Sequence, residues 1–124
     1  MIKLSVVIPA YNEEKNIEKG VLAQVRNYLE DQKINYEVIV VDDGSSDASV
    51  ELIKKYISSF KNFHLIQNEH RGKAMTILTG MEKAVGEIVL FTDMDQATPI
   101  NQLEKFMPKF SAKGGPASGW DIVI

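Results

Sequence analysis

The stretch YEVIVVDDGSSD, residues 36–47, joins an uninterrupted apolar run to a short acidic turn. Residues 36–41 are rich in β-branched side chains and do not alternate with polar ones, which is typical of a strand covered on both faces. The turn is followed by apolar residues at helical spacing, from Val50 to Ile57. A covered strand followed by a helix indicates a βαβ unit of a parallel sheet.

The same order of strand and helix recurs along the whole chain. The pattern predicts strands at residues 4–9, 36–41, 63–67, 87–92 and 121–124, helices at residues 13–29, 47–60, 72–85 and 100–110, and a loop at residues 111–119. We therefore predict an α/β fold with a mainly parallel sheet and helices on both faces, in one domain over residues 1–124.

The ends and faces of the predicted helices also have candidates. Asn12 is a candidate N-cap of the first helix, and Ser45 or Ser46 of the second. The buried stripe of the helix at residues 72–85 is expected to consist of Ala74, Ile77, Leu78, Met81 and Val85.

Composition limits the classes of function. The 124 residues carry a net charge of −3, which gives no basic surface for nucleic acid. There is no cysteine, no apolar run long enough to cross a membrane and no signal peptide, so we expect a cytoplasmic location. Because the sequence stops within the apolar run of residues 120–124, we also expect it to be the truncated part of a longer protein.

Polar residues follow each predicted strand where it ends. They are PAYNE at residues 9–13, DDGSS at residues 42–46, NEHRGK at residues 68–73 and DMD at residues 93–95. In an open parallel sheet, ligands bind beyond the carboxyl ends of the strands. We therefore expect these four segments to converge on one site.

Asp93 and Asp95 are the candidate metal ligands. In an extended segment they would point to the same side, and two carboxylates together suit Mg²⁺ or Mn²⁺, which could then hold a diphosphate. The alternative is a solvated turn in which one of them caps the helix near Ile100.

The other strand ends have both a binding and a structural interpretation. Of Asp42 and Asp43, one could accept hydrogen bonds from loop amides while the other accepts from a base or a ribose. The alternative is that the Asp and Ser residues of this segment cap the following helix. Arg71 and Lys73 suit a phosphate but could form a solvated basic turn. Tyr11 could stack on a base or cover the sheet edge. His64 and His70 have no ligand spacing and are interpreted as structural.

Four segments together resemble a known family. SVVIPAYNEEKNI, YEVIVVDDGSSD, RGKAMTILTGMEKAVGEIVLFTDMD and WDIVI are similar, in this order, to family 2 glycosyltransferases of the GT-A fold, and most of all to polyprenyl or dolichyl phosphate sugar synthases. The resemblance implies a UDP- or GDP-sugar donor, Mg²⁺ or Mn²⁺, and inverting transfer to a lipid phosphate or another acceptor such as a glycan. It is compatible with membrane association through residues outside this chain, at the cytoplasmic face.

The resemblance also implies roles for individual residues. The nucleotide-sugar site would include Pro9, Ala10, Tyr11, Asn12, Glu13, Val41, Asp43, Gly72, Lys73, Asp93 and Met94, with Val41 and Asp43 at the base and Asp42 bracing its loop. Asp93 and Asp95 would be the catalytic residues and the metal ligands. One departure concerns Ala97, which stands where some relatives have a metal-binding Gln, while Gln96 comes one residue earlier.

Three other functions remain open at this point. A phosphoacceptor receiver domain has similar size, but it would need acidic residues at 10–13 and at 67–68, where the sequence has AYNE and QN. A sugar nucleotidyltransferase would need a Gly-rich phosphate loop after the first strand. The third is a fragment that binds a nucleotide without turnover, and we expect no turnover by this chain alone.

Overall fold

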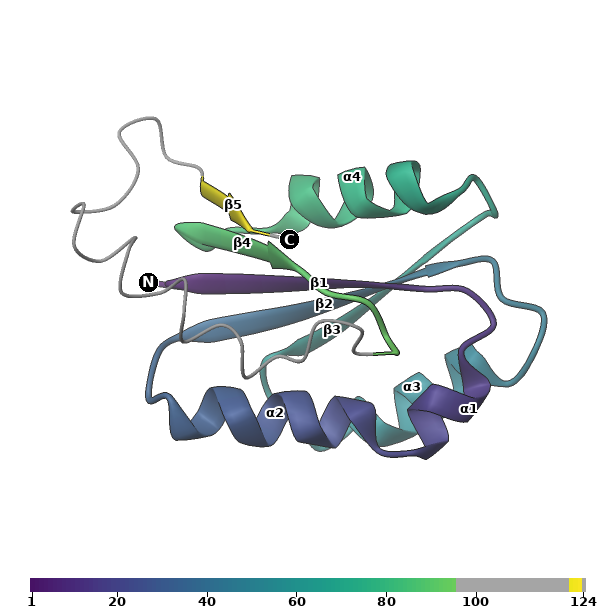
Figure 1. Ribbon diagram of the computed structural model, residues 1–124, viewed down its shortest axis with the longest axis horizontal. Helices are drawn as coiled ribbons and strands as arrows, with labels where there is room; N and C mark the ends of the chain where they lie inside the picture. The colour runs from purple at the N-terminus through teal and green to yellow at the C-terminus, as the bar shows by residue number, and fades with distance from the viewer. Residues whose placement is uncertain (96–120, 124) are drawn as a thin grey trace.

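The computed structural model describes residues 1–95 and 121–123, which form a five-stranded sheet in the order β3-β2-β1-β4-β5 (Figure 1). All its paired strands are parallel. The strands are β1 (Leu4–Ala10), β2 (Tyr36–Asp43), β3 (Phe63–Asn68), β4 (Ile88–Phe91) and β5 (Asp121–Val123), and the helices are α1 (Glu14–Glu18), α2 (Val21–Asp31), α3 (Ser49–Ile57) and α4 (Lys73–Lys83). The predicted parallel α/β fold is confirmed, and the helix predicted at 100–110 and the loop at 111–119 lie outside the described residues.

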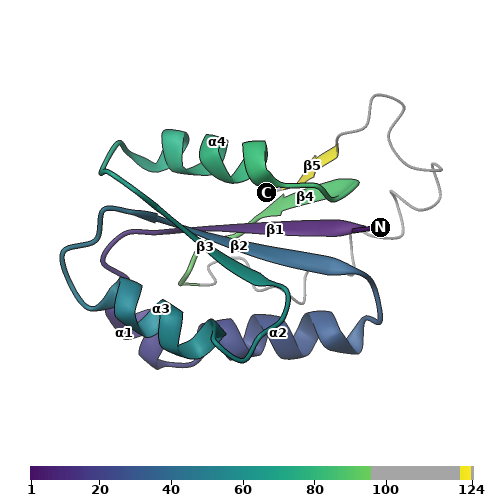
Figure 2. The ribbon, with the colours of Figure 1, turned by 180° about the vertical axis from the view of Figure 1, so that it is seen from behind.

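Helices cover both faces of the sheet. α1, α2 and α3 lie on one face and α4 lies on the other, as the two opposite views show (Figures 1 and 2). Alternate strand residues therefore enter two separate cores: Val6, Val38 and Val40 pack with the first group of helices, and Val7 and Val41 pack beneath α4. This explains why the strands read as continuous apolar runs.

The strand order decides between two doubly wound folds. Receiver domains have the order 2-1-3-4-5, whereas the order here is 3-2-1-4-5. The receiver interpretation is therefore wrong. From β1 the chain adds β2 and β3 on one side, and it then adds β4 and β5 on the other side. An open parallel sheet has its ligand crevice where the strand order reverses in this way, here between β1 and β4.

The helix predicted at residues 13–29 is two helices. Gly20 has φ +88°, in the left-handed region that interrupts a right-handed helix, and it is the N-cap of α2. Its N–H bonds to the carbonyl of Ile17 at 3.0 Å, so α1 closes as a single tight turn before α2 begins. Apolar spacing did not reveal the break because Ile17 and Val21 are buried on both sides of it.

The predicted buried stripe of α4 is wrong in part. Leu78 is 44% exposed and Val85 69%, while Thr76 and Gly80 face the sheet and are buried. A Cβ at Gly80 would collide with Cγ1 of Val7. The helix lies so close to the sheet that small residues face inward. Of the predicted stripe, only Ile77 and Met81 pack in the core beneath α4, together with Ala84. Within residues 1–95 and 121–123, no helix combines the length and hydrophobicity needed to span a bilayer.

Candidate functional site

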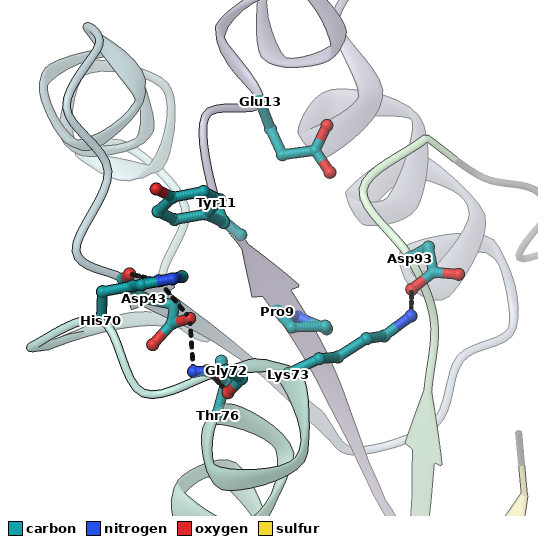
Figure 3. Close-up of a pocket in the computed structure, with 10 residues that line it drawn as sticks. Pro9, Tyr11, Glu13, Asp43, His70, Gly72, Lys73, Thr76 and Asp93 are labelled. Atoms are coloured by element: carbon teal, nitrogen blue, oxygen red, sulfur yellow. Dashed lines mark hydrogen bonds and ion pairs between the residues drawn. The ribbon is translucent and has the colours of Figure 1, made fainter.

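A cavity of about 210 Å³ opens at the carboxyl edge of the sheet, beside the crevice between β1 and β4 (Figure 3). It is lined by residues from all four predicted strand-end segments and by Thr76 of α4; the lining residues are Pro9, Ala10, Tyr11, Glu13, Asp43, His70, Gly72, Lys73, Thr76 and Asp93. Eight of these ten were predicted from the sequence. His70 and Thr76 were missed as site residues, although His70 belongs to one of the predicted strand-end segments.

The cavity opens where β1 extends beyond the end of its neighbour β4. β4 ends at Phe91, and the next N–H, of Thr92, still bonds to the carbonyl of Val7. Pro9 directs its backbone to the same side as Val7, two residues further on, where β4 has already ended. Proline has no N–H that would lose a strand partner there, so it suits a strand end that borders a ligand cavity.

Asp42 braces the loop after β2. One carboxylate oxygen accepts N–H bonds from Gly44 at 3.1 Å and Ser45 at 2.9 Å, and the other accepts from the Ser45 hydroxyl at 2.6 Å. Gly44 adopts φ +76°, which a residue with a side chain rarely does. The predicted bracing role of Asp42 is confirmed.

Asp43 holds the loop between β3 and α4. Its oxygens accept from the backbone N–H of Arg71 at 2.8 Å and of Gly72 at 3.0 Å, and its carboxylate lies 2.9 Å from Nδ1 of His70. Burial alone would raise the pKa of Asp43, but the two amides and the His70 ring together lower it below its usual 3.8. The carboxylate is therefore ionised at neutral pH and organises the third strand-end loop around itself.

His70 and Tyr11 form a stacked pair at one end of the cavity. Their ring centroids are 4.3 Å apart with an interplanar angle of 25°. Figure 3 shows the Tyr11 ring lying against His70, with Asp43 beside it. Because Tyr11 follows β1 and His70 follows β3, the pair joins loops that are distant in sequence.

Charged side chains occupy the other end of the cavity. Nζ of Lys73 lies 2.7 Å from Oδ1 of Asp93, so the lysine side chain reaches from the start of α4 to the segment after β4 (Figure 3). Glu13 also lines the cavity, and its carboxylate accepts from Asn16 at 2.9 Å. The cavity thus has an aromatic end and a charged end.

The candidate caps have other roles. Asn12 has φ +52°; its N–H donates to the Ser45 hydroxyl at 2.8 Å, and its side-chain oxygen accepts from the N–H of Ser46 at 2.8 Å. The N-caps of α1 and α3 are Glu13 and Ala48, and neither makes a side-chain cap bond. The predicted caps are therefore wrong, because these side chains tie the first two strand-end loops together. Asn12 is not among the residues that line the cavity.

Three other predicted site residues lie away from the cavity lining. The side chains of Val41 and Met94 are fully buried in the two cores, and Asp95 is exposed. β4 ends before Thr92, and Met94 and Asp95 form a turn, so the alternation of an extended strand does not set the direction of Asp93 and Asp95. Burial of Met94 instead anchors this segment against the core.

A divalent metal fits the chemistry of this segment if its coordination is shared between protein carboxylates and the phosphates of a substrate. Carboxylate oxygens are the ligands that Mg²⁺ and Mn²⁺ prefer, and Mg²⁺ is usually held by one or two carboxylates together with substrate phosphates. In the described part of the chain, no three His, Asp or Glu side chains cluster as a complete metal site. Gln96 and Ala97 lie outside the described residues.

Comparison with known proteins identifies the family. Residues 5–117 match the family model of glycosyl transferase family 2. The chain belongs to this family. It is 38% identical over 109 residues to a dolichyl-phosphate beta-glucosyltransferase of Trichomonas vaginalis, covering 83% of this chain and 33% of that protein. It is 34% identical over 125 residues to an undecaprenyl-phosphate 4-deoxy-4-formamido-L-arabinose transferase of Aeromonas hydrophila, covering 98% and 36%.

Solved structures of the family share the fold. A mannosyltransferase from Pyrobaculum calidifontis, solved in complex with GDP-Man and Mn²⁺, superposes with a TM-score of 0.66 at 31% identity, over 81% of this chain and 29% of that one. The predicted GT-A fold is confirmed. The match to glycosyl transferase family 2 disfavours the nucleotidyltransferase alternative. The chain spans about a third of the length of the curated relatives that it matches.

Proposed function

We propose that the whole protein transfers a sugar from a nucleoside-diphosphate sugar to a polyprenyl or dolichyl phosphate, and that residues 1–124 are the donor-binding, N-terminal part of its GT-A domain. The observation that carries this proposal is a cavity at the reversal point of the sheet, with an aromatic end and a charged end, in a chain of glycosyl transferase family 2. Relatives named for transfer to dolichyl or undecaprenyl phosphate support the acceptor class.

The two ends of the cavity suggest how the donor lies. Tyr11 is 46% exposed, and its ring offers a planar apolar surface for the base. Lys73 carries its positive charge to the opposite end, and α4 begins at this residue, so the positive end of the helix dipole also favours phosphate there. The cavity is smaller than the roughly 300–1,000 Å³ of typical ligand pockets. The sugar would therefore extend out of the cavity.

Asp93 and Asp95 are the residues that would hold Mg²⁺ or Mn²⁺. When bound, the ion would stabilise negative charge on the departing diphosphate as a Lewis acid. Asp93 now contacts Lys73, so donor and metal would meet a carboxylate and an ammonium that are already positioned beside each other. Lys73 would stabilise the same leaving diphosphate by charge-assisted hydrogen bonds.

The acceptor determines what else the reaction needs. A lipid phosphate is already anionic and requires no general base. Direct attack opposite the leaving diphosphate inverts the configuration of the sugar carbon, which is why we propose an inverting transfer. A lipid phosphate also places the reaction at a membrane surface, and we propose the cytoplasmic one.

A nucleotide panel tests the proposal. Thermal unfolding of the chain is measured with UDP, GDP, ADP and CDP, each with and without Mn²⁺. UDP or GDP should raise the melting temperature, and more so with Mn²⁺, because a ligand that binds only the folded state stabilises it. Equal shifts with all four nucleotides, or none with UDP and GDP, would contradict the proposal. We expect no sugar transfer by this chain alone, because it spans only about a third of its relatives.

A further inference from the structure

His70 makes more contacts at the cavity than any assigned role accounts for. It lines the cavity, stacks on Tyr11 and contacts the carboxylate of Asp43. We propose that His70 is a positioning residue for the nucleobase: its ring stacks on and fixes the ring of Tyr11, and the Tyr11 ring is the platform on which the base binds. This inference rests on the proposed nucleotide-sugar function.

The His70 ring is held from one edge by Asp43. Nδ1 of His70 lies 2.9 Å from a carboxylate oxygen of Asp43 and 3.1 Å from its backbone carbonyl. Both of these atoms are acceptors, so Nδ1 carries a proton and donates to them. Asp43 is itself buried and fixed by the amides of Arg71 and Gly72. The orientation of the imidazole is therefore set by a rigid part of the sheet edge.

The backbone of His70 is also held in place. A Cβ at Gly44 would lie 2.8 Å from the backbone nitrogen of His70 and 3.2 Å from its Cβ. The loop after β2 thus packs directly against the loop after β3, and only glycine permits this approach. Gly44 and Asp43 together present the imidazole to the Tyr11 side of the cavity.

Tyr11 needs such a support. Its backbone neighbour Asn12 is tied to Ser45 and Ser46, but the Tyr11 side chain is 46% exposed. A ring that is already held by stacking loses less side-chain freedom when a ligand binds, and this preorganisation increases affinity. Aromatic pairing of this kind corresponds to about 3- to 10-fold in a binding constant.

Two substitutions of His70 separate the ring from its hydrogen bond. His70→Phe keeps a ring that can stack on Tyr11 and removes the donor to Asp43. His70→Asn keeps a donor close to the position of Nδ1 and removes the ring. If His70 acts through the stack, the Phe variant should bind UDP or GDP within about 2-fold of wild type, and the Asn variant should bind about 3- to 10-fold more weakly. The reverse order would show that His70 only secures the loop through Asp43, and it would overturn the inference.

Two further measurements make the test specific. Inorganic diphosphate, titrated with Mn²⁺, should bind both variants as it binds wild type, because it occupies only the charged end. In a Tyr11→Ala background, His70→Asn should cause no additional loss of nucleotide affinity, because the platform is already lost. Weakened diphosphate binding, or a full additional loss, would contradict the positioning role.

Failure of the proposed function can be told apart from failure of this inference. NMR ring-current shifts of the Tyr11 ring protons report the stack without any ligand, and they should persist in the Phe variant and disappear in the Asn variant. If wild type shows the stack but binds neither UDP nor GDP with Mn²⁺, the proposed function fails and the base-binding role fails with it. If wild type binds a nucleotide and the Asn variant binds it equally well, only the inference about His70 fails.

Discussion

Lys73 and Asp93 lie in ion-pair contact, with Nζ 2.7 Å from Oδ1, across the charged end of the cavity. One residue begins α4 and the other follows β4, so the pair depends on the parallel arrangement of the sheet. Both side chains are partly exposed, at 63% and 42%, and such a contact contributes little to stability. We interpret it as a pair of binding groups held beside each other.

The Lys73 ammonium is expected to contribute directly to nucleotide affinity. Lys73→Met should weaken binding of UDP or GDP by about 10-fold or more, because a hydrogen bond to a charged group contributes about 1.5–3 kcal/mol. Isothermal titration calorimetry with Mn²⁺ measures the change. Lys83→Met, in the exposed last turn of the same helix, is the matched control and should leave affinity unchanged. Equal effects of the two substitutions would contradict a phosphate-binding role for Lys73.

The Asp43 carboxylate is expected to stabilise the fold in a pH-dependent way. Asp43→Asn should lower the free energy of unfolding by about 1–3 kcal/mol at pH 7, because buried amides lose a charged acceptor. The pKa of Asp43 in the folded protein is lowered, so its contribution is present above the unfolded-state pKa and is lost as the pH falls through the folded-state value.

Urea unfolding between pH 7 and pH 3 tests this expectation. The difference in free energy of unfolding between wild type and Asp43→Asn should become smaller below the usual aspartate pKa of about 3.9. Asp31→Asn, at the exposed end of α2, should change stability by less than about 0.5 kcal/mol. A difference for Asp43→Asn that stays constant over the whole pH range would rule out the carboxylate charge as its source.

Any side chain larger than that of Gly80 is expected to destabilise the protein, because α4 contacts the sheet at this residue. Gly80→Ala should destabilise the protein by about 1–3 kcal/mol through overpacking against Val7. In an exposed helix the same change would stabilise by about 1 kcal/mol, since alanine is the better helix former. Chemical unfolding shows whether Gly80→Ala lowers or raises the free energy of unfolding. Glu82→Ala, two residues along on the exposed face, serves as the control and should have little effect.

The fold was predictable because its strands are apolar throughout. Runs such as VIVV and IVLF are what a parallel sheet covered by helices requires, and the helix between each pair gives the βαβ order. The face of α4 was not predictable from apolar spacing, because the close approach of the helix to Val7 selects Gly80 and not the large residue Leu78.

The candidate site could be predicted from the sequence to about the same extent as the fold. The carboxyl ends of parallel strands meet at one edge, which is why Tyr11, Asp43, Lys73 and Asp93 could be placed together without knowing any distance. The contact of His70 with Tyr11 and Asp43 had no sequence signal, since nothing in the spacing of residues 11, 43 and 70 fixes how their loops meet. The turn at Met94 and Asp95 was predicted only as an alternative, because an Asp-x-Asp segment that follows a strand can equally continue it in extended conformation.

Metal-assisted binding of a nucleoside diphosphate is the central claim, and calorimetry on two proteins tests it most directly. UDP and GDP are titrated into wild type and Asp95→Ala, each with Mn²⁺ and with EDTA. We predict saturable binding of one nucleotide to wild type that is much weaker with EDTA, and loss of that Mn²⁺ effect in Asp95→Ala. Binding of UDP or GDP to Asp95→Ala with an undiminished dependence on Mn²⁺ would contradict the account.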